Sequence, residues 1–82
     1  GAHMTARAEI VARILDHAQF VHGAAPDDPI ACDTPLIDLV DSLDLQEIGF
    51  RVETEFGIEL IELDENTTVD SIADAVIAAM GA

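Results

Sequence analysis

The sequence predicts an all-α fold, a small bundle of three to four helices with a long loop between the first and the second. Three stretches place apolar residues at steps of three and four, the spacing of one helix face, and no stretch shows the alternation of a strand. An interval rich in proline and aspartate separates the first stretch from the second. The 82 residues suffice for a single domain, assigned to residues 5–82. Residues 1–4, Gly-Ala-His-Met, are expected to be an expression-tag remnant.

The first helix is expected from Thr5 to about Val21. Thr5 suits the N-cap position and Gly23 suits a C-terminal stop. Residues 23–40 are expected to form the long loop, because its three prolines block helix continuation and its aspartates favour turns. A loop of that length in a small domain tends to be functional. Four aliphatic residues are expected to anchor it on the helices: Leu36, Ile37, Leu39 and Val40.

The second helix is expected from Ser42 to Phe56, with Gly57 ending it. Gly49 is unfavourable inside a helix, so the sequence predicts a close helix contact there. Its buried stripe is expected to contain Leu45, Ile48, Val52 and Phe56, extended sideways by Leu43 and Phe50.

A turn or a single helical turn is expected over residues 58–66. Thr67 or Thr68 then caps the last helix, with Asp70 three residues after Thr67 in the manner of a capping box, and Gly81 closes it. Short connections between the later helices favour an up-down bundle. The buried stripe of this helix is expected to contain Val69, Ile72, Ala73, Val76, Ile77 and Met80.

The charge of the chain limits its partners. Seventeen acidic residues face three arginines and no lysine, a net charge of −14. Nucleic acid and membranes are excluded as partners, because both require a basic surface. An acidic surface attracts basic patches on partner proteins and repels its own copies, so a monomer is expected. No apolar run approaches the roughly 20 residues of a membrane span, and a cytoplasmic protein is expected.

No catalytic or metal site is expected. Ser42 has no histidine near it in sequence and no Gly-x-Ser-x-Gly turn, so a hydrolytic serine is disfavoured. Aspartate groups beginning at Asp38 and Asp64 lack the glycine and glutamate that a calcium loop needs at its sixth and twelfth positions. Cys32 is interpreted as a spectator thiol, and His17 and His22 as surface or core-edge residues.

Ser42 itself can be interpreted in two ways. Asp41 and Ser42 are good N-cap residues, which explains them structurally. However, Asp44 and Glu47 gather at the same helix end, where unpaired N–H groups and the helix dipole suit a phosphate ester on the hydroxyl. Two functions therefore remain open: a protein modified at Ser42, and an unmodified acidic adaptor that docks a basic partner protein.

The triplet Asp41-Ser42-Leu43 resembles the Asp-Ser-Leu attachment motif of acyl carrier proteins. The resemblance covers residues 34–80 clearly and residues 5–21 only by pattern. Further matches are Asp44, Glu47, Ile48, Val52, Glu53, Glu55 and Phe56 along the second helix, and Glu59-Leu60 and Thr67-Thr68-Val69 before the last helix.

This resemblance implies that Ser42 carries 4′-phosphopantetheine, which a phosphopantetheinyl transferase installs from coenzyme A with Mg²⁺. The thiol of that arm would hold an acyl or aminoacyl group as a thioester, and the chain would catalyse nothing itself. Further partners would be a loading ligase or acyltransferase, and a ketosynthase or other downstream enzyme. Asp41 would help to position the serine in the transferase, and the residues expected to dock partners are Leu43, Asp44, Glu47 and Glu53.

The chain also departs from the family pattern. Leu39 stands where the family usually has a glycine, two residues before the aspartate, and Gly49 and Arg51 replace frequent aliphatic residues. The segment before Thr67 is shorter than in fatty-acid carriers. These differences favour a discrete carrier of a polyketide, nonribosomal peptide or related specialised pathway over primary fatty acid synthesis.

Overall fold

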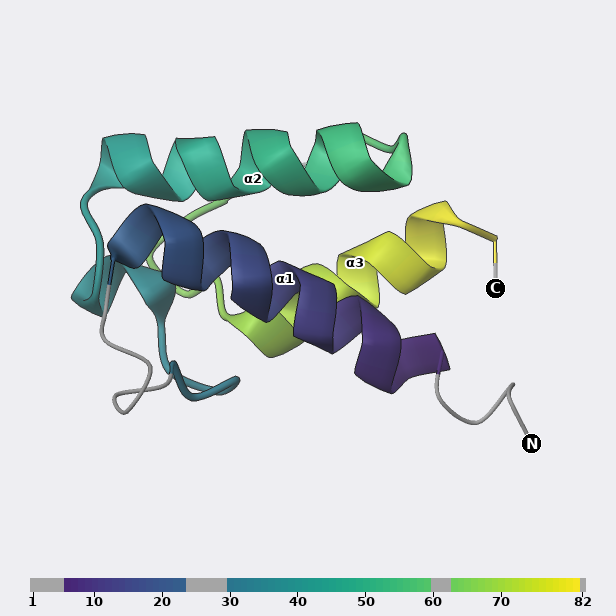
Figure 1. Ribbon diagram of the computed structural model, residues 1–82, viewed down its shortest axis with the longest axis horizontal. Coiled ribbons are helices and arrows are strands. Elements are labelled where there is room, and N and C mark those ends of the chain that lie inside the picture. Colours follow the sequence, from purple (N-terminus) through teal and green to yellow (C-terminus); the bar gives the residue numbers. More distant parts are fainter. Residues whose placement is uncertain (1–5, 24–29, 60–62, 82) are drawn as a thin grey trace.

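The computed structural model describes residues 6–23, 30–59 and 63–81. These residues form only helices and loops, which confirms the predicted small helical bundle (Figure 1). The Thr5 cap and residues 24–29 of the expected long loop lie outside the described residues. The elements are α1 (Ala6–His22), the short 3-10 helix η2 (Leu36–Asp38), α2 (Ser42–Phe56) and α3 (Val69–Ala79).

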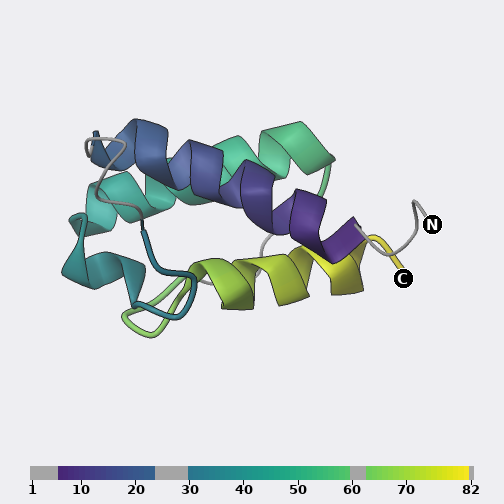
Figure 2. The ribbon, with the colours of Figure 1, turned by 60° about the horizontal axis from the view of Figure 1, so that its bottom comes forward.

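Helix α1 is the centre of the bundle and packs against both α2 and α3 (Figures 1 and 2). Both views show α2 and α3 running in the same general direction, opposite to α1. The predicted up-down order is therefore wrong for the last two helices. The start of α3 accordingly lies at the opposite end of the bundle from the end of α2 (Figures 1 and 2).

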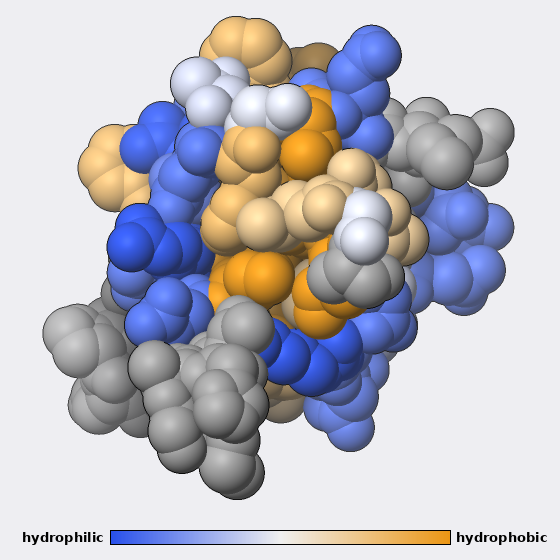
Figure 3. All heavy atoms as spheres, turned by 90° about the vertical axis from the view of Figure 1, so that its right-hand side faces the viewer, coloured by the Kyte–Doolittle hydropathy of each residue, from blue (hydrophilic) through white to orange (hydrophobic). Residues whose placement is uncertain are grey.

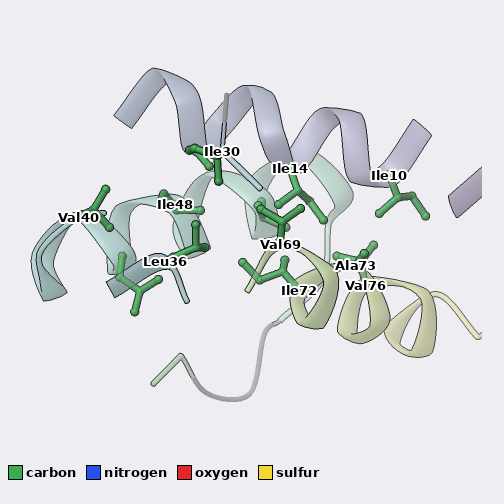
Figure 4. Close-up of a cluster of buried hydrophobic side chains, with 13 residues drawn as sticks. Ile10, Ile14, Ile30, Leu36, Val40, Ile48, Val69, Ile72, Ala73 and Val76 are labelled. Atoms are coloured by element: carbon green, nitrogen blue, oxygen red, sulfur yellow. The ribbon is translucent and has the colours of Figure 1, made fainter. Parts of the chain in front are cut away.

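The core is aliphatic and receives side chains from all four elements. Figure 4 shows Ile14 of α1, Leu36 of η2 and Ile48 of α2 directed into the same interior as the α3 side chains. Burying each such side chain contributes about 1.5–3 kcal/mol. Gly49 also lies among the buried residues of α2, as a close helix contact requires. The largest fully buried side chains are Ile14, Leu36, Ile48, Val52, Val69, Ile72 and Val76.

Three residues predicted to join the core are exposed instead. The exposed fractions are 78% for Leu43, 66% for Phe50 and 56% for Met80. Leu43 and Phe50 are seven residues apart, so they share a face of α2 that points away from the core. Met80 is the C-cap residue of α3, beyond its last full turn. Figure 3 shows further apolar side chains gathered at the end of the bundle where α2 and α3 terminate.

The segment before α2 is anchored as predicted. Leu36 and Val40 are buried, and Ile37 and Leu39 are partly buried against the same core. Residues Leu36–Asp38 of this segment form the short helix η2. Of the turn or single helical turn expected over residues 58–66, the structure has a turn at Glu65 and Asn66, and no helix is found at the described residues 58–59 and 63–66.

Of the two caps that the sequence left open for α3, Thr67 and Thr68, the structure has the second. Thr68 is the N-cap, and its capping-box partner is Ser71, not Asp70. Thr67 is only 6% exposed, and its hydroxyl oxygen accepts a hydrogen bond from the Asp64 N–H at 2.9 Å. The Thr67 side chain is therefore occupied in the preceding turn, and the helix begins after Thr68.

Gly23 and Gly57 end the first two helices as predicted. Their φ angles are +73° and +66°, in the left-handed region that favours glycine. The Gly57 N–H donates to the Glu53 carbonyl oxygen at 2.8 Å, which closes the last turn of α2.

Candidate functional site

Ser42 is the first residue of α2, and its side chain is exposed (teal end of α2 in Figure 1). Within residues 6–23, 30–59 and 63–81, no group hydrogen-bonds to its hydroxyl. The N–H groups of the first helical turn have no partner within the helix, and the helix dipole is positive here. The hydroxyl is therefore free to accept a substituent, and a phosphate on it would lie near these N–H groups.

Asp41 forms the N-cap that precedes Ser42. Its extended backbone (φ −81°, ψ 178°) starts the helix, and its Oδ1 accepts the Asp44 N–H at 2.8 Å. Its carbonyl oxygen accepts the Leu45 N–H at 2.9 Å, the first bond of the helical ladder. The capping interpretation of Asp41 is thus correct. The cap also fixes the backbone next to Ser42, so it is compatible with a role in presenting that serine.

A second Asp-Ser pair provides a comparison within the chain. Asp70-Ser71-Ile72 repeats the pattern of Asp41-Ser42-Leu43 at the start of α3. The Ser71 hydroxyl oxygen accepts the Thr68 N–H at 2.9 Å, and the hydroxyl donates to the Thr68 carbonyl oxygen at 2.9 Å. Ser71 is therefore committed to the capping box. The triplet alone does not distinguish the two serines, but their positions relative to the caps do.

The structure brings three of the four predicted docking residues together. Leu43, Asp44 and Glu47 lie in the first two turns of α2 with Ser42, and Leu43 and Glu47 are exposed. Glu53 lies eleven residues after Ser42, about 16 Å further along the helix axis. The docking role of all four residues stays a prediction.

Glu47 has a partner that the sequence analysis missed. Its Oε2 lies 3.5 Å from Nη1 of Arg51, one helical turn later. The guanidinium carbon of Arg51 also lies 4.2 Å from the ring centre of Phe20, on α1. The four-residue spacing of Glu47 and Arg51 is a recognisable signal for such a pair. The contact with Phe20 depends on helix packing and has no local signal.

A second ionic cluster joins α1 to α2. Glu55 lies 2.7 Å from Arg13 Nη1 and 2.5 Å from His17 Nε2. Burial tends to raise the pKa of the Glu55 carboxyl, but the hydrogen bonds and charges of His17 and Arg13 outweigh it and lower that pKa. The His17 side chain is 20% exposed, which agrees with a core-edge residue. This cluster connects helices and does not include Ser42.

Arg7, on α1, forms ion pairs with two carboxylates of α3. Its guanidinium lies 2.6 Å from Asp74 and 3.6 Å from Asp70. Each of the three arginines is thus paired with a carboxylate. Arg7 and Arg13 pair with carboxylates of neighbouring helices, whereas Arg51 pairs with Glu47 within α2, so among the acidic residues near Ser42 it is Glu47 whose charge is partly balanced.

Other chemistries find little support in the part of the chain that the structure describes. There, no group of three or more His, Cys, Asp or Glu side chains is arranged to hold a metal ion. None of the described helices combines the length and the apolar character of a membrane span. Burial, together with nearby Asp70 and Asp33, raises the pKa of the Cys32 thiol, which lowers its reactivity.

Comparison with family models, curated proteins and solved structures finds no match. The function is therefore inferred from the geometry at Ser42 and from the sequence resemblance around it. The arrangement provides an accessible nucleophilic oxygen on a fixed helix end, with an acidic surface around it. Such an arrangement suits a protein that is modified by another enzyme.

Proposed function

We propose that the chain is a carrier protein whose Ser42 bears 4′-phosphopantetheine. One observation carries the proposal: the Ser42 hydroxyl is exposed and uncommitted at the first position of α2, directly after the Asp41 cap. The resemblance of residues 34–80 to acyl carrier proteins supports it. By contrast, the Ser71 hydroxyl is engaged in hydrogen bonds.

The modification requires a phosphopantetheinyl transferase, coenzyme A and Mg²⁺. Ser42 Oγ forms a bond to the phosphorus that bears the pantetheine chain, and the pyrophosphate bond of coenzyme A breaks. The adenosine bisphosphate half leaves, and the hydroxyl proton passes to a base of the transferase. The chain supplies the nucleophilic oxygen, and the Asp41 cap holds the backbone that presents it.

The residues around Ser42 fit a phosphodiester. The ester carries one negative charge and would lie beside the N–H groups of the first turn that the Asp41 side chain does not cap, where the helix dipole favours an anion by about 0.3–1 kcal/mol. The neighbouring Asp41 carboxylate opposes this, but its Oδ1 is engaged with the Asp44 N–H. When bound, the arm supplies a thiol that holds an acyl or aminoacyl group as a thioester.

The carrier would shuttle its cargo between enzymes of a polyketide, nonribosomal peptide or related specialised pathway, without catalysing the transfers. Its partners would be the transferase, a loading ligase or acyltransferase, and a ketosynthase or another downstream enzyme. The net charge of −14 favours encounters with enzymes that present basic surfaces. The same charge opposes self-association and supports a monomer.

Intact-mass measurement tests the proposal. After incubation with coenzyme A, Mg²⁺ and a promiscuous transferase, the protein should gain about 340 Da, the mass of one phosphopantetheine group. Ser42→Ala should gain nothing, while Ser71→Ala should gain the same mass as the wild type. A wild-type protein that takes up nothing, under conditions that load a control carrier, would contradict the proposal and favour the unmodified acidic adaptor.

A further inference from the structure

The two ends of the bundle differ in how the core is closed. At the end that carries Ser42, η2 and the residues after it cover the core, and Leu36 and Val40 are buried there. At the opposite end, where α2 and α3 terminate, no described element lies across the core (Figures 1 and 2). Figure 3 looks onto this end and shows apolar side chains gathered at its centre. The core therefore reaches the surface there.

Four apolar residues at or next to the last turns of α2 and α3 are defined here as the end patch: Phe56, Ile58, Ile77 and Met80. The first three pack against the core but are only partly buried. Met80 is 56% exposed and follows Ile77 by three residues, which places the two side chains next to each other on the helix. Apolar side chains that lie together on a surface mark a place where another molecule binds.

The charge at this end of the bundle is negative. Helices α2 and α3 both terminate here, and the carbonyl groups of its last turn give each helix end about half a negative charge. Neither of these last turns contains a basic residue. Glu59, which is exposed, directly follows Ile58 of the end patch. A cation placed beside the end patch would therefore be stabilised.

The basic residues of the chain do not neutralise this end. Arg7, near the start of α1, is engaged with Asp70 and Asp74. The other two arginines pair with carboxylates of α2, and the sequence contains no lysine. The positive end of the α1 dipole lies at the same end of the bundle, and Glu9 in its first turn offsets it. The two helix ends and Glu59 thus favour a cation from another molecule.

We propose that the end patch anchors the chain to a partner protein, through a segment of the partner that combines apolar side chains with lysine or arginine. The apolar side chains would cover Met80 and its neighbours, and the cations would lie beside the two helix ends. Charge complementarity favours such a segment over a second copy of the chain, whose net charge is −14. The inference goes beyond the proposed function, because the end patch includes neither Ser42 nor the predicted docking residues.

The position of the end patch leaves Ser42 accessible. Phe56 follows Ser42 by fourteen residues, about 21 Å along the axis of α2. A standard protein interface covers about 800 Å² on each partner, a disc of roughly 16 Å radius. A segment centred on the end patch would therefore leave Ser42 uncovered. One protein can then hold the chain while another acts on Ser42.

A designed peptide tests this inference, with fluorescence anisotropy as the measurement of affinity. The probe is a labelled helical peptide with leucine on one face and lysine on the other. Met80→Ser should weaken binding about tenfold, as expected for an anchor of an interface. Phe50→Ser is the matched control, because it removes a similarly exposed apolar side chain from α2 and should bind like the wild type.

A second peptide, with serine in place of leucine, separates apolar anchoring from charge attraction. It keeps the charge of the first peptide and should bind about tenfold more weakly. Ser42→Ala should bind the leucine peptide like the wild type, so the result does not depend on the modification of Ser42. Equal affinities of the two peptides, or an unchanged affinity of Met80→Ser, would overturn the inference.

NMR amide shifts locate the bound leucine peptide. The signals that move should belong to the last turns of α2 and α3, and shifts centred on Ser42 would overturn the inference. Sedimentation velocity of the free chain should show a monomer, because like charges repel. A dimer that Met80→Ser dissociates would assign the end patch to self-association and contradict the proposal.

Discussion

The backbone N–H of Asp70 donates to the carbonyl oxygen of Cys32 at 3.0 Å. The donor is one of the N–H groups in the first turn of α3 that has no partner within the helix. A second bond, from the Leu36 N–H to the Thr67 carbonyl oxygen at 2.9 Å, lies nearby. These two hydrogen bonds connect the segment before Ser42, at Cys32 and Leu36, to the start of α3. The loop that leads to Ser42 is therefore held against the bundle.

The Asp41 cap is expected to stabilise the helix end that presents Ser42. Asp41→Ala removes the acceptor of the Asp44 N–H and should lower the stability by about 1 kcal/mol. For a domain of this size, the loss corresponds to a decrease in Tm of about 4–8 °C in thermal unfolding followed by circular dichroism. Asp41→Asn keeps an acceptor and should unfold close to the wild type. Equal losses in both variants would show that the charge, not the cap, is responsible.

Thr67 is expected to hold the turn that precedes α3. Thr67→Val keeps the shape of the buried side chain but leaves the Asp64 N–H without its acceptor, which should cost about 1–3 kcal/mol. Urea unfolding measures the loss, and the m-value should stay unchanged. Thr67→Ser keeps the hydroxyl and serves as the control. If Thr67→Val unfolds at the same urea concentration as Thr67→Ser, the hydrogen bond does not carry the stability assigned to it.

Ile14 is expected to be a central contact of the core, since its side chain is fully buried between the helices. Ile14→Ala should cost about 2–5 kcal/mol and Ile14→Val about 0.5–1.5 kcal/mol, measured by urea unfolding. Met80→Ala, at an exposed position, should change the stability by no more than about 0.5 kcal/mol. Similar losses at Ile14 and Met80 would contradict the described packing.

The Glu55 cluster is expected to make stability depend on pH in the acid range. His17 and Arg13 hold the pKa of Glu55 below its ordinary value of 4.5, so folding favours the ionised carboxylate. This contribution is present above pH 4.5 and is lost as the pH falls through the lowered pKa. The stability advantage of the wild type over Glu55→Gln should therefore shrink as the pH falls below 4.5, in unfolding curves recorded at several pH values.

Arg13→Gln provides the control for this effect. It removes one of the two partners of Glu55, so the pKa of Glu55 should be lowered less. The pH-dependent stability advantage over Glu55→Gln should therefore be smaller for Arg13→Gln than for the wild type. An advantage that grows on acidification would contradict the sign of the Glu55 shift.

Helix α2 shows how much of the fold was accessible from the sequence. Its bounds, Ser42 and Phe56, agree with the prediction because both ends are set by local signals. Asp41 is a strong cap residue, and Gly57 readily adopts the left-handed conformation that ends the helix.

Features that depend on distant partners were predicted less well. Thr67 looks like a cap in sequence, but its carbonyl oxygen bonds Leu36 and its side chain bonds the turn, so Thr68 takes the cap position. The parallel course of α2 and α3 likewise has no local signal.

In the candidate site too, features set by neighbouring residues could be predicted from the sequence, and features set by distant residues could not. The position of Ser42 follows from the neighbouring cap, so its exposure at a helix end could be predicted. The pairing of Glu47 with Arg51 had a spacing signal that went unused, and the stacking of Arg51 on Phe20 had none. The sequence assigned Leu43, Asp44, Glu47 and Glu53 to docking but placed Phe50 beside the buried stripe, whereas its side chain is exposed.

Site-resolved mass spectrometry tests the central claim most directly. Because the chain has three arginines and no lysine, trypsin places Ser42 in the fragment 14–51 and Ser71 in the fragment 52–82. After incubation with coenzyme A, Mg²⁺ and the transferase, fragment 14–51 should carry the phosphopantetheine mass and fragment 52–82 should be unchanged. The group on fragment 52–82, or on neither fragment while a control carrier is loaded, would contradict the account.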